Sequence, residues 1–139
     1  MANTVVIDGR ISRLSDDSAI TELCLKDQSA DALIRAIFLR ILSRPATTVE
    51  TERLVSYLGE TYHDRIVAGA RIKPPMRASA RRVSWSNHLH PQATVIQQQE
   101  ERVVREGDPA TDRLTPAFRE RMEEIVWALV NSPQFVFIP

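Results

Sequence analysis

The most regular hydrophobic pattern in the chain lies between Ser29 and Ser43. Its apolar residues recur at the three- and four-residue spacing of one helix face, and they are Leu33, Ile34, Ile37, Phe38, Ile41 and Leu42. Ser29 stands where a helix N-cap is expected, and Pro45 cannot continue a helix. The pattern therefore predicts an amphipathic helix over residues 29–43.

A second helix is predicted directly after the first. Thr47 and Glu50 have capping-box spacing, in which the hydroxyl accepts a backbone N–H and the carboxylate reaches back to the cap. The helical spacing of apolar residues that follows this cap fades near Gly69. The inner face of this helix carries Leu54, Val55, Leu58 and Tyr62. Because only a short proline-containing turn separates the two helices, we expect an antiparallel helical hairpin.

Weaker patterns predict three further helices. A short one lies around residues 18–25. Another begins at Pro91, ends near Gly107 and carries Ala93, Ile96, Glu100, Val103 and Val104. The last is capped by Thr115, has Pro116 at its first position and buries Phe118, Met122, Ile125, Val126 and Leu129.

The remaining segments show no helical period. Residues 71–91 are irregular and contain Pro74 and Pro75, while residues 4–7 and 135–138 could form short extended segments. No pair of alternating strands is evident. The sequence thus predicts a single, mainly α domain over residues 1–139, a small helical bundle with an irregular basic loop.

Composition narrows the function classes. The 139 residues are 43% apolar and 26% charged with zero net charge, which is typical of a soluble globular protein and argues against a nucleic-acid partner. No apolar run reaches the length of a membrane span. The single cysteine, Cys24, excludes an internal disulfide, and no Cys-x-x-Cys-His motif attaches a c-type haem. We therefore expect no cofactor in this chain.

The charge is unevenly distributed. Residues 65–99 contain six basic residues and no acidic one. One interpretation is a module that binds anions or sulfated carbohydrate through the loop 71–85, using Arg77, Arg81 and Arg82 beside Trp85. The other, which we favour, is a basic loop that lies across the protein's own acidic helices and pairs with them.

Two histidines form the second candidate site. His88 and His90 are two residues apart, so in an extended segment both rings project from one side and can bind zinc or copper. A metal site usually needs a third or fourth ligand, and the remaining histidine is His63. Asn87 and Pro91 favour a structural turn that leads into the next helix.

No catalytic residue is predicted. Ser84, Ser86 and Cys24 lack a nucleophile-elbow motif or an activating neighbour pattern. The four glycines are widely separated, which excludes a glycine-rich phosphate loop. The two tryptophans, Trp85 and Trp127, are better read as core or interface anchors than as cofactor platforms.

Three stretches nevertheless resemble one family. They are residues 37–54, which contain Ser43-Arg44-Pro45 between two helices; residues 85–93, Trp-Ser-Asn-His-Leu-His-Pro-Gln-Ala; and residues 114–137, which include Asn131-Ser132-Pro133-Gln134-Phe135. The chain resembles, over roughly residues 20–139, the planctomycete-type C-terminal domain of unknown function. That domain ends large proteins that often carry a cytochrome-c-like domain near their N-terminus.

The resemblance implies a setting rather than a chemistry. It implies an extracytoplasmic or periplasmic, multidomain, haem-associated system whose other domains or partner chains contact this one. It supplies no catalytic residue. We therefore expect a non-catalytic docking domain, and the apolar residues expected to face a partner are Trp85, Phe135 and Phe137.

Overall fold

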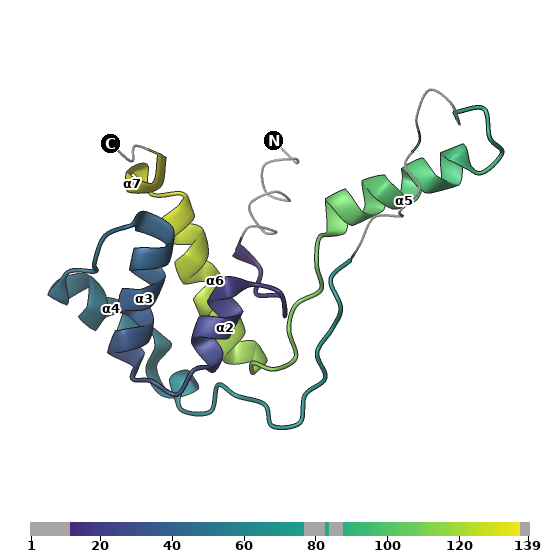
Figure 1. Cartoon of the computed structure of the whole chain (residues 1–139). Helices are drawn as coiled ribbons and strands as arrows, with labels where there is room; N and C mark the ends of the chain where they lie inside the picture. The colour runs from purple at the N-terminus through teal and green to yellow at the C-terminus, as the bar shows by residue number, and fades with distance from the viewer. Residues whose placement is uncertain (1–11, 77–82, 84–87, 137–139) are drawn as a thin grey trace.

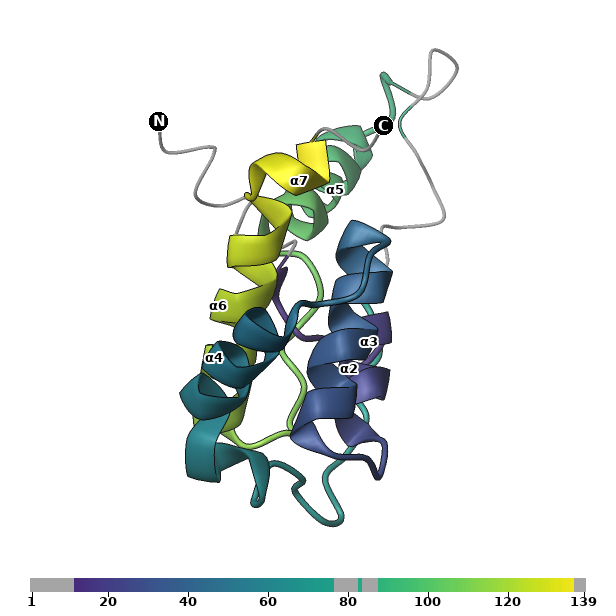
Figure 2. The ribbon, with the colours of Figure 1, turned by 90° about the vertical axis from the view of Figure 1, so that its left-hand side faces the viewer.

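Helix α3 (Ala30–Leu42) lies at the centre of a small helical bundle (Figure 1). It packs against α2 (Ala19–Leu25), α4 (Thr48–Leu58), α6 (Pro116–Val130) and the short α7 (Pro133–Val136). Figure 2 shows α4 running back beside α3, as expected of a helical hairpin. The predicted mainly α class and the bundle are confirmed.

The computed structural model describes residues 12–76, 83 and 88–136. Of residues 135 and 136 it describes the backbone alone. Within these ranges, extended pairing is limited to two isolated antiparallel bridges, Ser15 with Ala110 and Ile66 with Leu114. None of the helices described there combines the length and the apolar character needed to cross a bilayer.

The helices begin where the capping residues predict. The Ser29 hydroxyl accepts the Ala32 N–H at 3.2 Å, which caps α3. The capping box of α4 is complete, because Thr47 Oγ1 accepts the Glu50 N–H and Glu50 Oε2 accepts the Thr47 N–H. Thr115 is the N-cap residue of α6, but its side chain makes no capping hydrogen bond.

Three predicted boundaries were wrong. The helix predicted to begin at Pro91 begins at Ala93. The second helix ends at Leu58 rather than near Gly69, because Gly59 has a positive φ of 51° and starts a 3-10 turn, η1 (Gly59–Tyr62). This turn still buries Tyr62. Near the C-terminus, residues 135 and 136 belong to α7 rather than to an extended segment.

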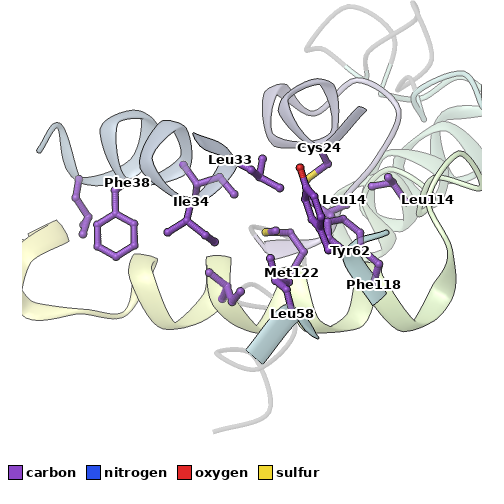
Figure 3. Close-up of a cluster of buried hydrophobic side chains, with 13 residues drawn as sticks. Leu14, Cys24, Leu33, Ile34, Phe38, Leu58, Tyr62, Leu114, Phe118 and Met122 are labelled. Atoms are coloured by element: carbon purple, nitrogen blue, oxygen red, sulfur yellow. The ribbon is translucent and has the colours of Figure 1, made fainter. Parts of the chain in front are cut away.

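The core lies between α2 and α3 on one side and α6 on the other (Figure 3). Phe38 projects from α3 toward α6, and Phe118 packs edge-on against Tyr62 with ring centroids 6.2 Å apart. Replacing a fully buried phenylalanine with alanine costs about 3–5 kcal/mol. The cluster comprises Leu14, Cys24, Leu33, Ile34, Ile37, Phe38, Leu42, Leu58, Tyr62, Leu114, Phe118, Met122 and Ile125.

Helix α5 (Ala93–Glu106) projects away from the bundle (Figure 1). Residues 68–76 lead toward it and residues 107–113 return. These connectors lie side by side, since Lys73 Nζ donates to the Ala110 carbonyl at 2.9 Å and the Met76 N–H donates to Asp108 Oδ1 at 2.7 Å. We refer to α5 with its two connectors as the arm.

A buried carboxylate holds the base of the arm. The Asp16 side chain is 2% exposed. Its Oδ2 accepts the Lys73 N–H at 2.7 Å, and its Oδ1 accepts the Thr111 hydroxyl at 2.5 Å. The guanidinium of Arg113 lies 4.0 Å from Oδ1. Asp16 therefore ties both connectors to the segment that precedes α2.

Candidate functional site

Most of the predicted site residues lie outside the described part of the chain. This holds for Arg77, Arg81, Arg82 and Trp85 of the anion-binding hypothesis, and for Phe137 of the predicted docking surface. Phe135 lies in α7, where the structure describes its backbone alone. The anion-binding hypothesis and the docking surface formed by Trp85, Phe135 and Phe137 therefore stay predictions.

The two histidines lie exposed in the turn that precedes α5. Both the ring and the backbone of His90 take part in this turn. The ring Nδ1 accepts the Gln92 N–H at 3.2 Å, and the backbone carbonyl of His90 accepts the Ala93 N–H at 2.9 Å. No group of three or more His, Cys, Asp or Glu residues that could hold a metal ion occurs within the described ranges. The metal hypothesis for His88 and His90 thus gains no support from this geometry.

Arg65, the first cation of the basic window, is a buried structural group. Its guanidinium donates to the Cys24 carbonyl at 2.8 Å, to the Lys26 carbonyl at 2.8 Å and to the Tyr62 carbonyl at 3.0 Å. It also lies 4.1 Å from the centroid of the Tyr62 ring. Carbonyls at the ends of α2 and η1 carry partial negative charge, so they stabilise the cation. Arg65 is therefore not available to an external anion.

Lys73, a second cation of this window, pairs within the chain. Its Nζ lies 2.8 Å from Asp112 Oδ1 and also donates to the Ala110 carbonyl. Pairing with the chain's own acidic residues is thus observed at Lys73, although the acid lies on the returning connector and not on a helix. The Arg71 side chain is exposed.

The single thiol is shielded from reaction. Cys24 is fully buried in the core. Desolvation raises the pKa of its thiol to about 12, although the nearby Arg65 cation acts in the opposite direction. Cys24 therefore stays protonated and packs as a small apolar residue.

A different site appears on the outer face of α6. Trp127 is 48% exposed, although α6 buries Phe118, Met122, Ile125 and Val126 on its inner face. Glu120, Glu123 and Glu124 precede Trp127 by seven, four and three residues, so all four side chains share one side of the helix. Together with Ser12, they line a hollow of about 300 Å³. We call this set the α6 outer face.

The three carboxylates of this face differ in their contacts. Glu123 already has partners within the chain: its Oε1 accepts the Leu14 N–H at 2.9 Å and lies 3.9 Å from Arg119 Nε. Glu124 accepts a hydrogen bond from the Tyr57 hydroxyl. Neither Glu120 nor Glu124 forms an ion pair with any described residue. The face therefore presents two carboxylates, those of Glu120 and Glu124, that form no ion pair within the described ranges, beside an exposed aromatic ring.

Sequence reasoning named Trp127 as a core or interface anchor but did not single out this face. The signal was nevertheless present, because Trp127 falls outside the apolar stripe of α6 and in register with the three glutamates. The contribution of Ser12 could not be seen, since it comes from a segment more than a hundred residues away.

No protein-family model, no curated protein and no solved structure matches the chain.

Proposed function

We propose that the chain is a non-catalytic helical docking domain that binds other domains or a partner chain of the same system. The observation that carries the proposal is the exposure of Trp127 on a helix whose opposite side is anchored in the core. Tryptophan is enriched among the residues that dominate binding energy, because its large ring gains much when a partner removes it from water.

The setting of Trp127 supports this proposal. Helix α6 packs against α3, α4, η1 and α7, so its backbone is held by much of the bundle. The partner would therefore meet a surface that is already ordered and would lose little conformational entropy on binding. The hollow of about 300 Å³ beside the ring offers room for a partner side chain.

We further propose that the larger system is the extracytoplasmic, cytochrome-c-associated kind that the family resemblance implies. Support comes from the three stretches that carry the resemblance, two of which meet in space. Arg44, from the Ser-Arg-Pro turn, donates hydrogen bonds to Gln134, from the C-terminal stretch. Motifs far apart in the sequence thus contribute to one local structure.

The docking function is tested with purified proteins. The chain is mixed with the protein from the same genome that carries the haem-binding and central domains, and complex formation is followed by sedimentation velocity. We expect a complex that Trp127→Ser weakens by about tenfold or more, because an anchoring aromatic ring is lost.

Leu39→Ser serves as the matched control, since Leu39 is a similarly exposed apolar residue (55%) on α3. Absence of any complex would contradict the proposal. So would equal weakening by both substitutions, because the association would then depend on general hydrophobicity rather than on the α6 outer face.

A further inference from the structure

We infer that the α6 outer face binds an arginine-bearing basic segment of the partner protein. This inference rests on the docking function proposed above and adds the chemistry of the partner. It begins from the charge of the face. Glu120, Glu123 and Glu124 lie three or four residues apart or adjacent on one helix, and like charges at the three- and four-residue spacings repel and destabilise the helix.

The neighbouring arginines of α6 do not neutralise this charge fully. Arg119 donates to the Thr111 carbonyl at 2.7 Å and reaches only Glu123, at 3.9 Å. Arg121 lies beside Tyr57, whose hydroxyl donates to Glu124: its guanidinium is 5.6 Å from the centroid of the Tyr57 ring and donates to the carbonyls of Tyr57 and Leu58 at 2.7 and 3.1 Å. Both guanidinium groups donate to backbone carbonyls, and within the described ranges neither forms an ion pair with Glu120 or Glu124. An external cation could therefore pair with these two carboxylates.

The aromatic ring specifies the kind of cation. An indole face attracts a cation through its quadrupole, and a planar guanidinium can stack on the ring while its N–H groups donate to carboxylates. Glu120 and Glu124 line the same hollow as Trp127, so one guanidinium in that hollow can meet both the ring and a carboxylate. An apolar partner would leave the carboxylates desolvated without a hydrogen bond, and an anionic partner would be repelled.

A metal ion is a poorer occupant of the same hollow. The three carboxylates are not among any group of described residues that converges closely enough to hold a metal ion. They spread along the helix around an indole ring, which supplies no ligand atom for a metal ion. The geometry therefore favours a flat organic cation over a point charge.

The inference is tested with a short peptide of alternating glycine and arginine, blocked at both ends. Its control is the same peptide with citrulline, a neutral isostere, in place of arginine. Binding is followed by the fluorescence of Trp127 in a Trp85→Phe variant. We expect saturable binding of the arginine peptide that weakens with added salt, and no comparable binding of the citrulline peptide.

Two double variants locate the binding. Glu120→Gln with Glu124→Gln should weaken binding of the arginine peptide by about tenfold, because it removes charge but keeps shape. Glu52→Gln with Glu101→Gln, which removes the same charge from exposed positions on α4 and α5, should leave it unchanged. Equal binding of the citrulline peptide, or equal loss in both double variants, would overturn the inference.

The two proposals fail in different ways. If the partner protein still requires Trp127 but binds the Glu120→Gln/Glu124→Gln variant with full affinity, the docking function stands and the basic partner is excluded. If Trp127→Ser changes neither partner binding nor peptide binding, the latter measured by isothermal titration calorimetry because the fluorescent ring is absent, both proposals are wrong. Circular dichroism of each variant checks that the helices remain folded.

Discussion

The guanidinium of Arg44 donates two hydrogen bonds to Oε1 of Gln134, at 3.0 Å from Nε and 2.5 Å from Nη2. It also forms a bidentate pair with Glu50, at 2.7 and 3.0 Å, and lies 5.2 Å from the centroid of the Phe38 ring. One arginine in the turn between α3 and α4 therefore contacts the cap of α4 and the start of α7.

The first prediction concerns the attachment of α7. Arg44→Ala should lower the free energy of unfolding by about 1 kcal/mol, because the Arg44–Glu50 pair is about one-third exposed and solvent screens it. Amide exchange in α7 should accelerate beyond this global effect, since the contact to Gln134 is lost. Arg40→Ala, at an exposed position of α3, is the control and should change neither measurement.

The second prediction concerns stability in acid. Hydrogen bonds from Arg44, and then from the Thr47 N–H, lower the pKa of Glu50 to about 2. Because the folded state favours the ionised carboxylate, its contribution is complete above about pH 4.5 and is lost as the pH falls toward 2.

Glu50→Gln should therefore flatten the decline in stability between these pH values, as measured by urea unfolding at a series of pH values. Glu52→Gln removes an exposed carboxylate of the same helix and serves as the control. If the stability of Glu50→Gln fell with decreasing pH as steeply as that of the parent chain, folding would not stabilise the ionised form of this carboxylate.

The third prediction concerns the buried cation. Arg65→Lys should lower the free energy of unfolding by about 3 kcal/mol, because one ammonium group cannot reach three carbonyls that converge on a planar fork. Urea unfolding measures the loss. Arg71→Lys, an exposed change of the same kind, should stay within about 0.5 kcal/mol of the parent. Similar values for the two variants would mean that the carbonyl cage contributes little.

The fourth prediction uses the thiol as a probe of opening. Cys24 is fully buried and its pKa is raised to about 12, so a thiol reagent should label it only when the bundle opens. In Arg65→Lys the labelling rate should rise about a hundredfold, which corresponds to the loss of about 3 kcal/mol. Fast labelling of the parent chain under native conditions would contradict the burial of this side chain.

The sequence predicted the helices well because their signals are local. The stripe of α3, the capping box at Thr47 and the proline at position 116 each depend on a few neighbouring residues. The end of α4 was missed because Leu58 and Tyr62 lie four residues apart, as on a helix, while a 3-10 turn in fact places Tyr62 in the core.

The roles of the charged residues were harder to predict. Nothing in the sequence near Arg65 indicates burial, because the carbonyls that it contacts belong to two separate segments, the end of α2 and the end of η1, which only the fold brings together. The α6 outer face was accessible in principle, since its glutamates and Trp127 share one helix. Its hollow was not, because one of the residues that line it, Ser12, lies more than a hundred residues away in the sequence.

The anchoring of the arm at Asp16 has a consequence for how this chain can vary. Both connectors are fixed where they leave the bundle, so the length of chain beyond them does not alter the path from η1 to α6. Closing a longer loop costs little additional entropy, since the cost rises only with the logarithm of length. The tip of the arm is therefore the place where insertions and deletions should be tolerated, and where a reporter could be introduced without disturbing the α6 outer face.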